Sequence, residues 1–203
     1  EPYINLSEDD INTFLLFVNN KDIEIPLTQQ NVLPLFYLGK QYEIPTLITH
    51  TNKYIQDFNL SLKYLIFFQN KPDFPLEEFI DQVSNDFLVY VHDRSHDLLK
   101  LNFNLLYQII EKAKIKSFSQ SEYIDFLFNC LDTYGRKASV LFQNIDFGSL
   151  QKKYFQRLLS YQTSDFDPNF INNEMLKSIY EKEIEIVNKE NEIKMKEQQL
   201  DDR

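Results

Sequence analysis

Two histidines, His92 and His96, are the first residues whose types and spacing could do chemistry. Four positions apart on a helix, they would share one face, and with Asp93 and Asp97 they could bind a divalent metal ion. No third histidine and no thiolate lie near them in sequence, and the Arg94-Ser95 step resembles a helix end. We therefore expect polar residues at a helix terminus rather than a metal site.

The single cysteine, Cys130, could act as a nucleophile only with a base and an orienting group beside it. It lies in the apolar run Phe126-Leu-Phe-Asn-Cys-Leu131, a setting that raises the pKa of a thiol and makes it inert. An enzyme would need a polar pocket that joins Cys130, His50 and a carboxylate, and nothing in the sequence links them. We expect a small buried core residue, and a lone cysteine also fits a reducing compartment.

Motifs for binding phosphate or calcium do not occur in the sequence. The three glycines are isolated and form no G-x-x-x-x-G-K-[ST] loop. Acidic clusters at Glu8-Asp-Asp10, Glu77-Glu78 and Asp201-Asp202 lie at helix starts or the chain end, where the helix dipole and solvation explain them. None has the spacing of a calcium loop. We expect a non-enzymatic protein with no catalytic residue, no metal and no cofactor.

Charge restricts the class of partner. The chain has 31 acidic and 21 basic side chains and a net charge of −10, which argues against nucleic acid or an anionic membrane. No run of apolar residues is long enough to cross a bilayer. A small basic group, Lys152, Lys153 and Arg157, is interleaved with Tyr154 and Phe155. Solvated helix faces are the default interpretation, and the hypothesis set beside it is a rim that docks an acidic protein surface, such as the tails of cytoskeletal polymers.

Prolines punctuate this glycine-poor chain. Two of them fall in the connector Asn70-Lys-Pro-Asp-Phe-Pro75 and another in Asp165-Phe-Asp-Pro168. The resulting division predicts three segments, 1–58, 60–164 and 169–203.

The first segment predicts a helix, a short strand and a helical hairpin. Ser7-Glu-Asp-Asp10 has the pattern of a capped helix start, Ile23-Glu-Ile25 that of a strand, and Pro45 that of a first helical turn. The middle segment predicts a bundle of short paired helices, one of which ends at Gly135.

The last segment carries a seven-residue repeat, typical of a helix that presents one stripe to a neighbour. Only one of the two seam positions is apolar, because Lys and Glu occupy the other. Two interpretations stay open. The helix either runs along a partner or a second copy, as in a coiled coil, or it is a solvated, charged helix. The stripe consists of Ile179, Ile186, Ile193 and Leu200.

The first segment carries a recognisable pattern at residues 14–25, Asn31-Val-Leu-Pro-Leu35, Leu38-Gly39, Tyr42-Glu-Ile44 and Leu47. With these residues it resembles the C-terminal half of a BTB/POZ domain, in which an apolar helix precedes a short strand and a helical hairpin. The middle segment carries matching residues within 84–88, 98–110, 122–136 and 150–159, and with them it is similar to a BACK domain, the helical domain that commonly follows BTB. Together the resemblance covers about residues 10–160 and is nearest to divergent BTB-type proteins expanded in some protists.

The resemblance implies a mainly α protein: a partial BTB-like unit, a BACK-like helical bundle and a long C-terminal helix. It implies a cytoplasmic protein–protein interaction module, a scaffold or structural subunit of a larger assembly. Candidate partners are cytoskeletal or axonemal filament components, such as microtubules, or a second copy bound through the C-terminal helix. The alternative is a substrate adaptor of a cullin-type ubiquitin ligase.

Three departures weaken that adaptor alternative. The N-terminal half of BTB, which holds the dimer helix and most of the cullin surface, is missing from this sequence. The tryptophan common in the second BACK helix pair has no counterpart, and no Kelch, zinc-finger or ankyrin repeat follows. Because the sequence starts at Glu1 without a signal peptide, we expect a piece of a longer cytoplasmic protein.

Overall fold

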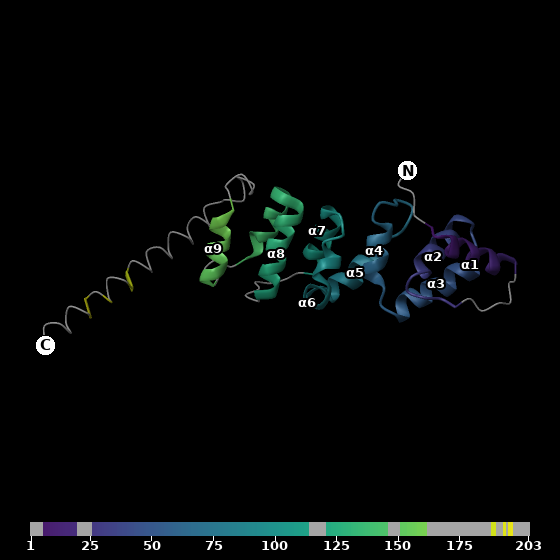
Figure 1. Cartoon of the computed structure of the whole chain (residues 1–203), viewed down its shortest axis with the longest axis horizontal. Helices are drawn as coiled ribbons and strands as arrows, with labels where there is room; N and C mark the ends of the chain where they lie inside the picture. The colour runs from purple at the N-terminus through teal and green to yellow at the C-terminus, as the bar shows by residue number, and fades with distance from the viewer. Residues whose placement is uncertain are drawn as a thin grey trace. The chain divides into compact units, whose positions relative to one another are not determined.

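The computed structural model describes residues 6–19, 26–113, 121–145 and 151–161, together with five residues of the C-terminal segment. Throughout these ranges the regular structure is helical, with no strand, which confirms the mainly α class (Figure 1). The predicted strand Ile23–Ile25 lies outside the described residues. The five residues of the C-terminal segment are all helical: Asn188, Lys189, Ile193, Met195 and Lys196.

Residue contacts divide the chain into two units, each described here by itself. The first contains residues 1–90 and 96–113, so the predicted boundary at residues 58–60 falls within it. Helix α6 (Phe87–Leu98) contributes to both units and loses helical geometry at Arg94. The other helices of the first unit are α1 (Glu8–Asn19), α2 (Val32–Gln41), α3 (Pro45–Asp57), α4 (Ser61–Phe68), α5 (Glu77–Asn85) and α7 (Phe103–Lys112).

Local sequence signals set where several helices begin. At the start of α1, a carboxylate oxygen of Asp10 accepts hydrogen bonds from the Ser7 backbone N–H at 3.0 Å and from its hydroxyl at 2.6 Å. The Ser7 hydroxyl in turn accepts from the Asp10 N–H at 3.1 Å, which confirms the predicted capped start. Pro45 occupies the predicted first turn of α3, where its missing N–H costs nothing. Asn102 caps α7 by accepting from the Leu105 N–H at 2.9 Å.

An aromatic cluster fills the first unit. The rings of Phe68 and Phe74 stack with centroids 4.3 Å apart, and Tyr64 stacks on Phe79 at 3.7 Å. Phe36 meets Tyr64 and Phe68 edge-on at 5.7 and 5.9 Å. Phe36 comes from α2, whereas the other four rings come from residues beyond 60. The predicted first and middle segments therefore share one core.

The Tyr64 hydroxyl is the one buried side-chain polar atom in the described residues that has no hydrogen-bond partner. Burial, followed by the charge of Glu78, raises the pKa of Tyr64, so the phenol stays neutral. An unsatisfied buried hydroxyl costs about 1–3 kcal/mol. We expect Tyr64→Phe, which keeps the ring and removes this atom, to raise the free energy of unfolding by roughly 1 kcal/mol in urea denaturation.

Tyr90→Phe is the matched control in the same unit. The Tyr90 hydroxyl donates to Asn59 Oδ1 at 3.1 Å, so its removal should lower the free energy of unfolding by about 1 kcal/mol. A Tyr64→Phe protein as destabilised as Tyr90→Phe would contradict the prediction.

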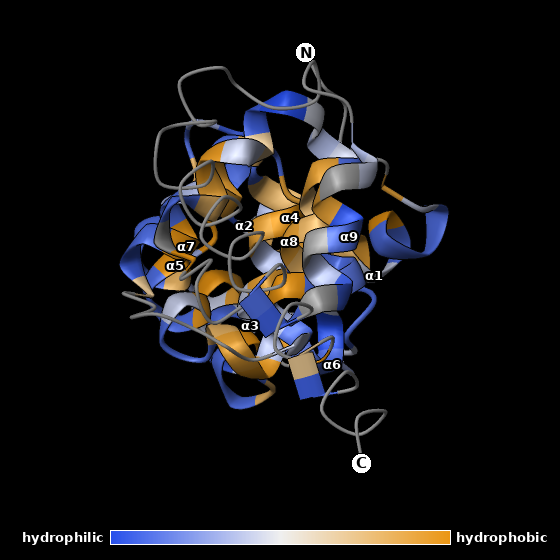
Figure 2. Cartoon of the chain, turned by 90° about the vertical axis from the view of Figure 1, so that its left-hand side faces the viewer, coloured by the Kyte–Doolittle hydropathy of each residue, from blue (hydrophilic) through white to orange (hydrophobic). Residues whose placement is uncertain are grey.

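The second unit contains residues 91–95 and 114–203. Its described elements include α8 (Ser121–Tyr134), the 3-10 helix η1 (Gly135–Asn144) and α9 (Lys152–Ser160). Gly135, with φ of 63°, follows the last residue of α8 and confirms the predicted helix end. Hydrophobic and hydrophilic stretches alternate along the helices (Figure 2). The apolar face of α8 is buried and includes Phe126, Leu127, Phe128, Cys130 and Leu131.

Candidate functional site

The two histidines do not converge on a metal site. Between them, Arg94 has φ and ψ of −140° and 32°, so the helix is interrupted at the predicted helix end. His92 Nδ1 lies 2.6 Å from Asp93 Oδ1, and His92 Nε2 lies 3.8 Å from a Glu122 carboxylate oxygen. The hydrogen bond to Asp93, followed by the charge of Glu122, raises the pKa of His92. No group of three or more metal-ligating side chains occurs among the described residues.

The cysteine lies in the core of the second unit. Cys130 has no exposed surface, and this burial raises the pKa of its thiol. The thiol is therefore protonated at neutral pH and closed to solvent, whereas a nucleophilic cysteine needs thiolate character and access. His50 is exposed on α3 of the first unit.

A polar depression of about 340 Å³ lies in the first unit, between the C-terminal end of α3 and one face of α5 that runs from its first turn to its last. Two carboxylates and four amides line it, and Gln56 Nε2 donates to Glu78 Oε1 at 3.2 Å. Its walls hold no nucleophilic hydroxyl or thiol and no histidine, so Glu78 and Asp86 are the lining residues with side chains suited to acid–base chemistry. The lining residues are Gln56, Asn59, Glu78, Gln82, Asn85 and Asp86.

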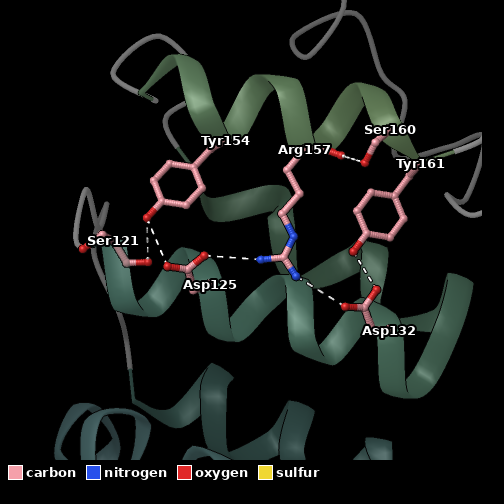
Figure 3. A network of polar contacts seen from close by, with 7 residues as sticks. All are labelled: Ser121, Asp125, Asp132, Tyr154, Arg157, Ser160 and Tyr161. Carbon is pink, nitrogen blue, oxygen red and sulfur yellow. Dashed lines mark hydrogen bonds and ion pairs between the residues drawn. The ribbon is translucent and has the colours of Figure 1, made fainter.

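Arg157 connects α9 to α8 (Figure 3). Its Nη1 donates to Asp125 Oδ1 and its Nη2 to Asp132 Oδ2, both at 3.3 Å. The two aspartates are seven residues apart and therefore share one face of α8. The guanidinium carbon lies 4.4 Å from the centroid of the buried Phe128 ring. The guanidinium group of Arg157 thus binds two carboxylates and lies over an aromatic ring.

Tyrosines on each side of Arg157 bind the same two aspartates. The Tyr154 hydroxyl donates to Asp125 at 3.2 Å, and the Tyr161 hydroxyl donates to Asp132 at 2.6 Å (Figure 3). Burial, followed by the hydrogen bond to Asp132, raises the pKa of Tyr161. The Tyr161 phenol is therefore a neutral donor at neutral pH, and the network of hydrogen bonds holds α9 on α8.

The predicted basic rim is only partly solvent-facing in the structure. Arg157 pairs with acids of α8, whereas Lys153 is exposed and its ammonium lies 4.5 Å from the centre of the Tyr154 ring. Lys152 is the first residue of α9, and its side chain lies outside the described residues. Docking of this rim on an acidic protein surface stays a prediction.

The predicted C-terminal stripe is described at one position. Ile193 is helical and 56% exposed, and Met195 close by is also exposed. Ile179, Ile186 and Leu200 lie outside the described residues. The role of this stripe in binding a partner or a second copy also stays a prediction.

Exposed apolar side chains concentrate on α1, a feature that the sequence analysis missed. Ile11, Leu15, Leu16 and Val18 are each between 42% and 57% exposed, and Tyr42 is 64% exposed. The Tyr42 ring lies 5.3 Å from that of Phe14, so it borders α1. We call these residues the α1 patch: Ile11, Leu15, Leu16, Val18 and Tyr42.

Helix α1 has two apolar faces. One carries Phe14 and Phe17, which pack against the core cluster that includes Leu35, Leu38 and Leu47. The other carries Ile11, Leu15 and Val18, whose spacing of four and three residues is the one helices use to pack on a neighbour. A surface helix normally has one apolar face. The sequence signal was the run of five apolar residues at 14–18, which is too broad for one face.

No helix in the described part of the chain is long and apolar enough to cross a membrane. Fold and surface thus define a mainly helical protein with an uncovered apolar helix face. No family model matches the chain, and no curated protein or solved structure matches it either. The BTB and BACK resemblance therefore remains a prediction from the sequence.

Proposed function

We propose that this chain is a non-enzymatic protein–protein interaction module, a scaffold or structural subunit that docks a partner helix on the α1 patch. The observation that carries the proposal is the exposed stripe of Ile11, Leu15 and Val18, which is spaced for helix packing. Contiguous exposed apolar patches mark interaction sites on proteins. In the finer form of the proposal, the helices are BTB-like and BACK-like and the assembly is a cytoplasmic, cytoskeletal one.

The energy available from this stripe suits a binding surface. Fully burying a Leu, Ile or Val side chain stabilises by about 1.5–3 kcal/mol relative to leaving it exposed. The three stripe side chains are each about half exposed, so covering them yields roughly 2–4 kcal/mol from the α1 side alone. A similar face on the partner would roughly double this gain, which is comparable with the low end of the about 4–15 kcal/mol cost of association, so stable binding also requires the partner to cover Leu16 and Tyr42 of the patch.

Site-specific photo-crosslinking tests this function. A photoreactive phenylalanine analogue at position 15 of the full chain should yield discrete adducts in native cells, several-fold above the same group at Lys53, an exposed site on α3. Adding Ile11→Asp and Val18→Asp should remove the adducts while circular dichroism stays unchanged. Equal yields from positions 15 and 53, or adducts that survive both aspartates, would overturn the proposal.

A further inference from the structure

We infer that the partner of the α1 patch is an amphipathic helix that lies antiparallel to α1 and carries Lys or Arg in its C-terminal turn. The inference rests on the proposed docking function of α1. It adds the charge, the direction and the residue spacing of the partner.

Every charged side chain on α1 is acidic, and all lie at one end. Glu8, Asp9 and Asp10 form the first turn, and the last turn has no basic residue. Asp10 is buried and accepts a hydrogen bond from the Ser7 backbone N–H, whereas Glu8 and Asp9 are exposed. Glu8 precedes Ile11 by three residues, so it continues the exposed stripe toward the N-terminus.

The other end of the stripe carries no net charge. Val18 is followed by Asn19, where α1 ends, and the last turn of the helix has no charged side chain. Beside Tyr42 of the patch, Lys40 and Glu43 are both exposed and their charges offset each other. The α1 patch is thus an apolar stripe with negative charge concentrated at one end.

A second copy of α1 does not complement this surface. Parallel pairing of two α1 helices would bring their acidic first turns together, and like charges disfavour such a complex. Antiparallel pairing would place Glu8 beside Val18 and Asn19 of the other copy, with no cation on that helix. Charge complementarity favours a partner whose own cation lies opposite Glu8 and Asp9.

The helix dipole then sets the direction of that partner. Lys or Arg in the last turn of a helix stabilises that helix, whereas the same residue in the first turn opposes its dipole. A cation in the last turn reaches Glu8 only if the partner runs antiparallel to α1. Such a helix would place apolar residues opposite Val18, Leu15 and Ile11 and a basic residue opposite Glu8. Along the partner these four positions are separated by three, four and three residues.

Three stapled helical peptides with one leucine stripe at this spacing test the inference on the full chain. The first carries two lysines in its last turn, the second carries them in its first turn, and the third has glutamates in the last turn. Fluorescence anisotropy at about 0.1 M salt measures the affinity of each peptide. The first peptide should bind tightest, with an affinity about tenfold higher than that of the glutamate peptide. In the double variant Glu8→Lys and Asp9→Lys, the glutamate peptide should bind more tightly than the first peptide. Leu15→Asp should abolish binding of all three peptides.

The outcomes separate the two proposals. If all three peptides bind equally and Leu15→Asp abolishes that binding, the charge and direction fail while the docking function stands. If no peptide binds, the inference fails, and adducts from position 15 decide whether the docking function fails with it. If sedimentation shows a dimer that Leu15→Asp converts to a monomer, a second copy is the occupant and the inference is overturned.

Discussion

Phe68→Ala is expected to lower the free energy of unfolding by about 3–5 kcal/mol, the usual cost of truncating a fully buried phenylalanine. Phe68 has no exposed surface and its ring packs on Phe74, Tyr64 and Phe36, so the surroundings cannot close over the cavity without moving several rings. Because natural domains are stable by only about 5–15 kcal/mol, this loss is a large share of the total. Urea denaturation followed by circular dichroism measures it.

Phe58→Ala is the matched control. Phe58 is 53% exposed, and its ring stacks on that of Tyr54 with centroids 4.3 Å apart. Its removal should therefore lower the free energy of unfolding by less than about 1 kcal/mol. Hydrogen exchange of peptides from α2 and α4 should accelerate in Phe68→Ala and not in Phe58→Ala. Equal destabilisation by the two variants would show that the aromatic cluster does not hold these helices together.

Local structure was predictable where neighbours in sequence decide it. The capped start at Ser7 and Asp10, the proline at the first turn of α3 and the helix end at Gly135 each involve residues a few positions apart. Such hydrogen bonds and backbone angles depend on residue types at fixed spacing. A pattern read along the chain therefore locates them.

The grouping of helices was harder to predict, because it depends on contacts between residues distant in sequence. Prolines suggested separate segments, yet Phe36 packs on Phe68 across the proposed boundary. Phe74, between Pro72 and Pro75, is itself buried in the same cluster. A proline-rich connector stops a helix but does not stop the core from continuing through it.

The candidate sites show the same limit. The sequence analysis placed Arg157 in a basic rim that docks an acidic protein surface, and in the structure two acids of α8 pair with this residue. The spacing of Asp125 and Asp132, seven apart on one helix face, was the available signal. On α1, burial of Phe14 was predictable from periodicity, whereas exposure of Leu15 depends on what packs against the helix. Sequence pattern locates apolar faces but does not say which of them stays uncovered.

Phe128→Ala is expected to free α9 from α8 and to cost about 3–5 kcal/mol. Phe128 has no exposed surface and meets Phe142 edge-on at 5.5 Å. The rings of Tyr154 and Tyr161 lie nearly parallel to it at 6.3 and 5.8 Å, and Arg157 lies over its face. Two residues of α9, Tyr154 and Arg157, and its C-cap residue Tyr161 thus rest on this one ring. Hydrogen exchange of the α9 peptide should accelerate strongly in the variant.

Comparison with Arg157→Ala decides whether the ring or the ion pairs hold α9. The Arg157 side chain is 35% exposed and its pairs with Asp125 and Asp132 are screened by solvent, so we expect its loss to cost only about 1–2 kcal/mol. Asn129→Ala, at the exposed neighbouring position of α8, should change stability by less than about 0.5 kcal/mol. If Arg157→Ala instead releases α9 as fully as Phe128→Ala does, the charged network outweighs the aromatic packing. In that case high concentrations of sodium chloride should also loosen α9, because salt screens the two ion pairs, whereas the burial of an aromatic ring is not weakened by salt.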